Sequence, residues 1–286
     1  MTQHVGWLIY RKEDTEKNKA FIDWFIDEGE KQQLNITFIP REQLMIQLNN
    51  GQVETYINEE LTALPDFVIN RTIEPVLTSL FTSANVRVFN PYETTHIANN
   101  KSLTHIEVNR LNIPMVRTIF TTKDLLSEKP PMDFPFVIKE STGRSGAQVH
   151  LIEATDEWAL CRQKIGRGDL VIQSSNVKPG RDVRVFIVGH EIIAAVLRKS
   201  DQDFRANFTL GGSAERYPLN TEERKMIQTI VDHFEFGMVG IDFLLAHDGT
   251  LLFNEIEDIV GSRILSHVTD ENILQTYVSY IKSQLK

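Results

Sequence analysis

The chain has 286 residues, of which 41% are hydrophobic and 24% are charged. This is the composition of a folded globular protein long enough for about two domains. The formal net charge of −9 argues against nucleic acid or an anionic membrane as the main partner, because both require a basic surface. No apolar run is long enough to cross a bilayer, no signal-peptide pattern opens the chain, and the single cysteine, Cys161, permits neither an internal disulfide nor a thiolate zinc cage. We therefore expect a cytoplasmic protein.

The first ninety residues alternate short apolar segments with helical patterns, which predicts a small doubly wound domain with a mostly parallel sheet. Thr15–Glu30 is expected to be a helix because Phe21, Trp24 and Phe25 share one side of it. Asn90-Pro91 is a natural break after this domain. The expected strands are Val5–Tyr10, 35–40, 66–70 and 86–90, with a second helix near Pro75–Ser83.

Beyond this break, a helix is expected over Tyr92–Leu111 and a strand over Met115–Phe120, and the pattern then changes to antiparallel pieces. Two long hairpins, turning near Gly189 and Asp248, suggest α+β lobes that face one another across a cleft. The predicted fold class is thus α/β and α+β, with domains at residues 1–93, 94–175 and 176–286. The other expected elements are strands at 136–140, 149–153 and 170–175 and helices at 154–165, 221–236 and 270–285.

The second hairpin brings acidic residues together. Asp248-Gly249 is a preferred two-residue hairpin turn, and with this tip Asp242 lies directly opposite Glu255. A four-residue loop gives the same pairing, whereas an odd-length loop does not. Glu257 points to the same face as Glu255 because side chains on a strand alternate. The opposite face, toward the core, would be filled by Val239, Ile241, Phe243 and Leu245, and Asn254 would share that apolar side.

Three acids on one sheet face repel one another unless solvent or a cation separates them. Oxygen ligands suit a hard ion, and proteins usually hold Mg²⁺ through carboxylates together with substrate phosphates. A solvated edge of the hairpin would explain the same acids.

Other segments carry residues suited to phosphates. Lys139 ends an apolar strand directly before a loop with Gly143 and Gly146, where backbone amides can approach phosphate oxygens, although an ordinary glycine turn also fits. Asp182 and Arg184 share one strand face. Arg198 ends the following strand, and Arg205 with Asn207 comes soon after. Each of these charged residues, taken singly, also fits a surface salt bridge.

In their order along the chain, these motifs resemble the ATP-grasp superfamily, and most closely the RimK-type ligases that add glutamate to a ribosomal protein. The resemblance extends from about Asn99 to the C-terminus, and its strongest stretches are GRDVRVFIVGHEIIAAVLRKSDQDFRANFTLGG and GMVGIDFLLAHDGTLLFNEIE. It implies an ATP-grasp fold with an N-terminal Rossmann-like domain. It also implies ATP and Mg²⁺ as cofactors, with two ions expected and Mn²⁺ as a substitute.

The resemblance also assigns roles. Asp242 and Glu255 match the magnesium ligands, and Glu257 stands where the family usually has asparagine, as a third oxygen donor. Lys139 and Arg205 would stabilise the transferring phosphoryl group. Arg198, Ser262 and Arg263 are expected near the substrate. The implied nucleotide contacts are Lys101, Lys139, Thr142, Gly143, Arg144, Ser145, Gly146, Gln173, Ser174, Ser175, Asp182, Arg184, Arg205 and Asn207.

The function implied is ATP-dependent ligation of a carboxylate to an amine through an acyl phosphate, with small-molecule or peptide substrates. Similar ligases commonly form dimers or tetramers, so a homo-oligomer is compatible with the resemblance. Two alternatives stay open: a kinase on the same scaffold, and a nucleotide-binding regulatory protein without turnover. Asp242→Asn and Glu255→Gln are each expected to abolish ATP turnover without disturbing folding.

Overall fold

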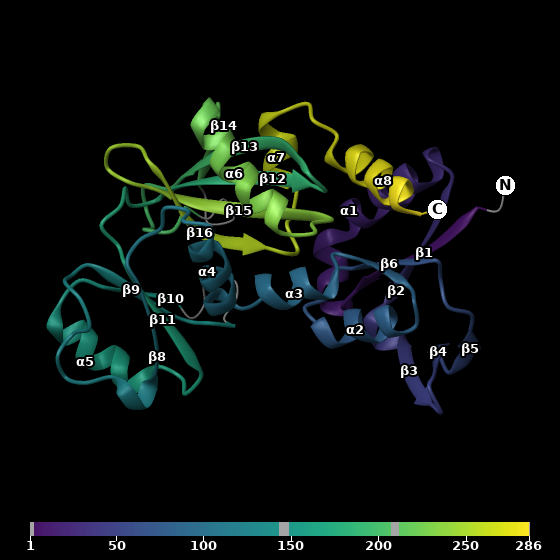
Figure 1. Ribbon diagram of the computed structural model, residues 1–286, viewed down its shortest axis with the longest axis horizontal. Coiled ribbons are helices and arrows are strands. Elements are labelled where there is room, and N and C mark those ends of the chain that lie inside the picture. Colours follow the sequence, from purple (N-terminus) through teal and green to yellow (C-terminus); the bar gives the residue numbers. More distant parts are fainter. Residues whose placement is uncertain (1–2, 143–148, 207–211, 286) are drawn as a thin grey trace.

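The computed structural model describes residues 3–142, 149–206 and 212–285. Within these ranges the strands form four sheets: a parallel sheet, a small antiparallel sheet beside it, and two larger antiparallel sheets (Figure 1). The helices are α1 Lys12–Lys31, α2 Pro75–Ser83, α3 Tyr92–Ala98, α4 Lys101–Arg110, α5 Thr155–Lys164, α6 Thr221–His233, α7 Arg263–Val268 and α8 Ile273–Gln284. The strands are β1 His4–Tyr10, β2 Leu34–Pro40, β3 Leu44–Asn49, β4 Gln52–Ile57, β5 Glu60–Thr62, β6 Phe67–Asn70, β7 Arg87–Phe89, β8 Thr118–Thr122, β9 Phe136–Glu140, β10 Val149–Ile152, β11 Asp169–Ser174, β12 Arg181–Val188, β13 Glu191–Lys199, β14 Ser213–Arg216, β15 Met238–Leu245 and β16 Leu251–Glu257.

The N-terminal sheet has the order β2-β1-β6-β7, and all of its pairs are parallel. Its strands are apolar because a parallel sheet is covered on both faces, and α1 and α2 are crossover helices of this sheet. This confirms the doubly wound start predicted from the sequence. The antiparallel sheet β3-β4-β5 was not predicted, and its side chains are largely exposed.

The sheet β10-β9-β11-β8 lies at the left of Figure 1, apart from the parallel sheet at the right. Helix α5 covers it, with the buried Trp158 packed edge-on against Phe136 at 5.6 Å between ring centroids. Strands β9 and β11 pair directly, so Lys139 and Val171 are neighbours in this sheet. The sheet therefore holds Lys139 on its second strand and Gln173 on its third.

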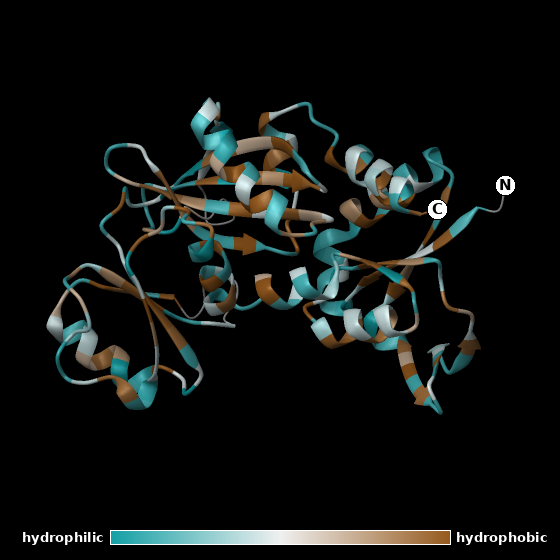
Figure 2. Cartoon of the chain, viewed as in Figure 1, coloured by the Kyte–Doolittle hydropathy of each residue, from teal (hydrophilic) through white to brown (hydrophobic). Residues whose placement is uncertain are grey.

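The five-stranded sheet β14-β13-β12-β15-β16 has two different faces. On one face Val183, Val185 and Ile187 alternate along β12 and pack with α6 residues in one core. On the other face, Phe186 and Val188 join a second core, whereas Asp182 and Arg184 occupy the opposite end of the same strand. In Figure 2 the hydrophobic colour concentrates in the strands, and the helices show mixed colours. One face of this sheet is thus apolar at one end and charged at the other.

The second core joins the beginning and the end of the chain. Tyr277 of α8 packs edge-on against Phe25 of α1 at 5.7 Å, and Met238 of β15 lies in the same cluster. The N-terminal sheet and the five-stranded sheet therefore share apolar side chains. The division at residues 1–93, 94–175 and 176–286 stays a prediction.

Two expected elements differ in the structure. The helix predicted over Tyr92–Leu111 is two helices, because the side chain of Asn100 accepts hydrogen bonds from the backbone amides of Ser102 and Leu103 and so caps a new start. The strand predicted from Met115 begins at Thr118. Helix α7 and strand β14 were not predicted. None of the described helices is both long and apolar enough to span a membrane.

Candidate active site

A cavity of about 330 Å³ lies between the five-stranded sheet, the sheet of β8–β11, and the junction of α3 and α4. Among the residues predicted as functional, those that line it are Lys101, Lys139, Gln173, Ser174, Ser175, Asp182, Arg184, Arg198, Arg205, Asp242, Glu255 and Glu257. Lys101 and Glu257 are 156 positions apart in the chain, so the fold brings most of the predicted site into one place. The cavity contains both carboxylates and bases, as a magnesium–nucleotide site requires.

Asp242 pairs directly with Glu255 in the structure, as predicted, but the turn is not the expected one. Leu245 pairs with Leu251, and residues 246–250 form a five-residue loop closed by a hydrogen bond from the Ala246 amide to the Thr250 carbonyl. This odd-length loop alone would have shifted the pairing by one residue. A β-bulge between Asp242 and Phe243 corrects the shift.

The same bulge corrects the prediction for Asn254. The extra residue in β16 places Asn254 at the cavity instead of in the apolar core, and its Oδ1 accepts a hydrogen bond from Lys139 Nζ at 3.3 Å. Phe253, its neighbour, is fully buried on the core side. The bulge therefore adds an amide oxygen to the carboxylate face.

Arginines neutralise the acids on the arginine wall, by which we mean Arg184, Arg198, Asp182 and Asp242 on strands β12, β13 and β15. Arg184 donates from Nε to Oδ1 and from Nη2 to Oδ2 of Asp242, both at 2.7 Å. Arg198 donates to both oxygens of Asp182 at 2.5 and 2.8 Å and to Oδ2 of Asp242 at 2.7 Å. Arg184 also pairs with Glu257. The sequence had left open whether solvent or a cation separates these acids. In the structure, the cations next to them are guanidinium groups.

Strand register explains this network. Asp182 is directly opposite Arg198 on β13, and Arg184 is directly opposite Asp242 on β15. Opposite charges at facing positions stabilise a sheet, so the Asp-x-Arg motif of β12 serves both neighbouring strands. The motif thus has partners inside the sheet, where the sequence had also allowed surface salt bridges.

The two aspartates of the wall have different acidities. Burial alone would raise the pKa of Asp242, but three N–H donors from two guanidinium groups hold this pKa at about 2. The pKa of Asp182 is raised to about 6, chiefly by burial, which outweighs the opposing charges of Arg198 and Arg184, and the charge of Asp242 adds to the increase. Asp242 is therefore a permanent anion in this site.

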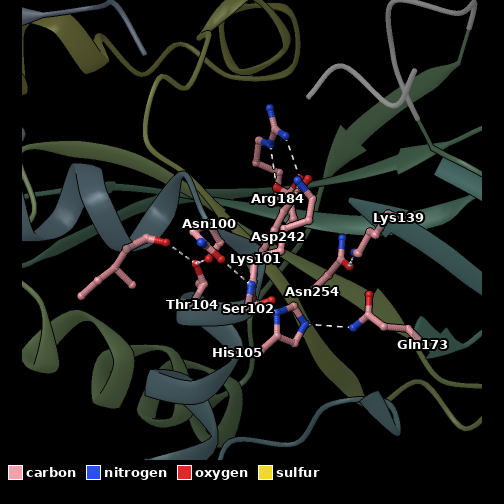
Figure 3. A network of polar contacts seen from close by, with 12 residues as sticks. Asn100, Lys101, Ser102, Thr104, His105, Lys139, Gln173, Arg184, Asp242 and Asn254 are labelled. Carbon is pink, nitrogen blue, oxygen red and sulfur yellow. Dashed lines mark hydrogen bonds and ion pairs between the residues drawn. The ribbon is translucent and has the colours of Figure 1, made fainter. Parts of the chain in front are cut away.

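The lysine wall, by which we mean Lys101, Lys139, Asn254 and Glu255, is held more loosely. Lys101 Nζ lies 3.8 Å from Glu255 Oε2. The hydrogen bond from Lys139 to Asn254 is long at 3.3 Å (Figure 3). Burial lowers the pKa of Lys139 to about 8, Glu255 opposes this effect and Lys101 adds to it. A nearby anion such as a phosphate would raise the pKa of this lysine again.

His105 joins the helix that carries Lys101 to the sheet that carries Lys139. Its Nδ1 lies 2.7 Å from the carbonyl oxygen of Lys101, and a carbonyl can only accept, so Nδ1 carries the proton. Nε2 of the neutral ring then accepts from the side-chain amide of Gln173 at 2.9 Å (Figure 3). Burial, followed by the charge of Lys139, lowers the pKa of His105 to about 4. A neutral histidine thus ties α4 to β11.

The other predicted residues divide into three groups. Arg205 lines the cavity and binds both oxygens of Asp203 at 3.0 and 2.7 Å. Thr142 and Arg263 are exposed and Ser262 is buried, and none of the three is part of the cavity lining. Gly143, Arg144, Ser145, Gly146 and Asn207 lie outside the described residues.

Two functional candidates were missed. Asn254 was placed on the apolar side because strict alternation was assumed, although Phe253 and Ile256, both buried, stand three positions apart and so mark the bulge. His105 lies four residues after Lys101, a predicted nucleotide contact, and this spacing on a helix was an available signal.

No group of three His, Cys, Asp or Glu side chains within the described ranges could hold a metal ion by itself. The donor set nevertheless fits magnesium, because Asp242, Glu255 and the Asn254 amide offer hard oxygen ligands next to cations that suit phosphates. Phosphate oxygens would complete such a site.

Comparison with known proteins gives consistent matches. Residues 98–281 match the RimK-like ATP-grasp domain family. An uncharacterised protein of Mycoplasma genitalium is 27% identical over 285 residues, covering 98% of this chain and 93% of that protein. The coenzyme gamma-F420-2:alpha-L-glutamate ligase of Methanocaldococcus jannaschii is 27% identical over 207 residues, or 69% of this chain and 72% of the ligase.

Solved structures agree on the fold. D-alanyl-alanine synthetase A from Vibrio cholerae superposes with a TM-score of 0.75 at 14% identity, covering 100% of this chain and 99% of that one. The ATP-grasp ligase PsnB, solved with a precursor variant, Mg and ADP, superposes with a TM-score of 0.73 at 13% identity, covering 98% of each chain. The chain therefore belongs to the RimK-like ATP-grasp family and has the fold of the ATP-grasp ligases, as its sequence motifs predicted.

Proposed function

We propose that this chain is an ATP-dependent carboxylate–amine ligase that works through an acyl phosphate and releases ADP and phosphate. The observation that carries the proposal is the cavity itself, where Asp242 and Glu255 lie opposite each other beside a lysine wall and an arginine wall. Family membership supports the ligase class, and the F420 glutamate ligase of M. jannaschii joins an amino acid, as its name says. The acceptor proposed here is an amino acid, peptide or related amine.

In this proposal, Lys101, Lys139, Arg184 and Arg205 bind the phosphates, and Asp182 lies near the ribose. Gln173, Ser174 and Ser175 line the cavity on the β11 side, where the adenine would be held through the backbone. Asp242 and Glu255 would hold two Mg²⁺ ions, for which Mn²⁺ substitutes. When bound, the ions supply electrophilic stabilisation of the transferring phosphoryl group.

The proposed reaction has two steps. A substrate carboxylate oxygen attacks the γ-phosphorus while the bond to the β-phosphate oxygen breaks and ADP leaves. The lysine and arginine side chains offset the charge that spreads over the transferring oxygens. An amine nitrogen then attacks the acyl carbon, the bond to phosphate breaks, and the amine loses a proton. The described residues at the cavity include no serine–histidine or cysteine–histidine pair, and neither step requires a protein nucleophile.

The test is phosphate release from ATP with candidate acids, with and without amines. Release that depends on the amine supports ligation. A stable phosphoester made without amine would instead identify a kinase. Tight binding of Mg-ATP with no phosphate release from any acid–amine mixture would identify a non-catalytic nucleotide-binding protein.

A further inference from the structure

Arg184 reaches across a whole strand. Its Nε and Nη2 bind Asp242 on β15, directly opposite, while its Nη1 lies 2.5 Å from Oε2 of Glu257 on β16. One guanidinium group thus joins carboxylates from two neighbouring strands. Arg184 has 12% of its side chain exposed and Asp242 has 2%, so the contact between these two residues is largely shielded from solvent.

Gly240 makes this reach possible. It lies between Arg184 and Glu257, since it is paired with Glu257 on β16 and is two residues from Asp242 on β15. A Cβ atom at position 240 would lie 3.4 Å from Cδ of Arg184 and 2.8 Å from Cγ2 of Val260. A larger side chain there would crowd Arg184. The glycine leaves space for the arginine side chain to cross β15 toward Glu257.

The two glutamates of β16 have different partners. Glu255 is opposite Asp242 and its ion pair is with Lys101, on the lysine wall. Oε2 of Glu257 is buried and faces Arg184 as an ion pair, without a well-aligned hydrogen bond. Glu257 therefore belongs with the arginine wall, and the three carboxylates do not gather around one point.

Charge explains why a glutamate can replace the usual asparagine at this position. A third carboxylate facing the same nucleotide would repel its phosphates, unless a nearby cation neutralises that carboxylate. Arg184 is that cation, and two of its five N–H groups remain available after its contacts with Asp242 and Glu257.

We propose that Glu257 is a positioning residue that restrains Arg184 against Asp242, and that it is not a magnesium ligand. The metal-binding carboxylates are then Asp242 and Glu255 alone. This inference rests on the proposed function for its role in nucleotide binding, but the contact between residues 184 and 257 can be tested without any ligand.

The ligand-free test is a double-mutant cycle on thermal unfolding with Glu257→Gln, Arg184→Gln and the double variant. With Arg184 present, Glu257→Gln should lower the midpoint by about 2–4 °C. In the Arg184→Gln background the same change should be neutral or stabilising, because it removes an unpaired anion. Equal effects in both backgrounds would overturn the proposal, whether or not the protein binds nucleotide.

The metal test uses Mn²⁺ binding in the presence of ADP, followed by the electron paramagnetic resonance signal of free Mn²⁺. Glu257→Gln should leave the Mn²⁺ affinity within about twofold of the wild type, while the matched variant Glu255→Gln should lose about tenfold or more. A loss at position 257 as large as that at position 255 would make Glu257 a ligand and overturn the proposal.

The positioning test measures ADP affinity without metal. Freeing Nη1 should tighten ADP binding by about threefold in Glu257→Gln. The gain should vanish when Arg184 is absent, whereas a simple charge effect of Glu257 would persist and contradict the restraint. If the wild type binds neither ADP nor ATP, the proposed function fails, and the unfolding cycle alone decides whether Glu257 holds Arg184.

Discussion

The two walls of the cavity carry similar charges but are built differently. The arginine wall lies on adjacent strands of one sheet, and its hydrogen bonds are between 2.5 and 2.8 Å. The lysine wall combines α4, β9 and β16, and its contacts are 3.3 and 3.8 Å. Strand register places the first set of charges, whereas the second depends on how separate elements meet. Strand pairing therefore holds the arginine wall through short hydrogen bonds, whereas these two contacts of the lysine wall join separate elements over longer distances.

The largest expected effect is on the arginine wall, with Asp242→Asn. This change should abolish ATP turnover and also destabilise the protein by roughly 3 kcal/mol, because two arginines lose their shared buried anion. The earlier expectation of intact folding is therefore revised on the structure. Activity assays together with urea unfolding check both parts, and a fully stable Asp242→Asn variant would contradict the buried network.

Glu255→Gln should reduce ATP turnover with little effect on the stability of the fold. Glu255 is partly exposed and its ion pair with Lys101 is long at 3.8 Å, so the free energy of unfolding should change by less than about 0.5 kcal/mol. Turnover should nevertheless fall by about 100-fold or more if this carboxylate binds metal. If Glu255→Gln destabilised the fold as much as Asp242→Asn, the lysine wall would be held as tightly as the arginine wall, contrary to this prediction.

Lys139→Met should weaken ATP binding by about tenfold while stabilising the protein at pH 7 by roughly 2 kcal/mol. The folded-state pKa of Lys139 is lowered to about 8 from 10.5, so the unfolded chain binds more protons between these values and wild-type stability rises with pH across that window. The advantage of the variant should therefore shrink as pH rises from 8 to 10.5. Unfolding curves of both proteins at pH 7 and pH 10 measure this advantage. The same difference in the free energy of unfolding at both pH values would contradict a lowered pKa for Lys139.

The smallest effect is expected at His105, which supports the lysine wall. Its folded-state pKa of about 4 lies below the ordinary value of 6.5, so its contribution to stability is present above pH 6.5 and is lost as pH falls toward 4. Between pH 7 and pH 5 the wild type should lose about 2 kcal/mol more than His105→Gln. Parallel losses in the two proteins would show that the ring is not held neutral.

The sequence predicted the parallel start, the two hairpins and twelve of the residues that line the cavity because these depend on local periodicity and motif order. It also predicted the Asp242–Glu255 pairing, but through a turn of the wrong length that a bulge at Asn254 compensates. A bulge interrupts the alternation of a strand, and in β16 the core residues Phe253 and Ile256 stand three positions apart, but the prediction assumed strict alternation. The helix break at Asn100 was also missed, although asparagine is a preferred N-cap residue.

The sequence by itself determined the family, the fold class and the types of residue at the site, because ordered motifs and strand alternation are encoded along the chain. Only the tertiary structure decided which charges are partners. Arg184 and Arg198 neutralise Asp242 because three strands lie side by side in one register, and His105 meets Gln173 because α4 packs near β11. The physical reason is that electrostatic pairing depends on distance in space, and a distance of three ångströms can separate residues more than forty positions apart.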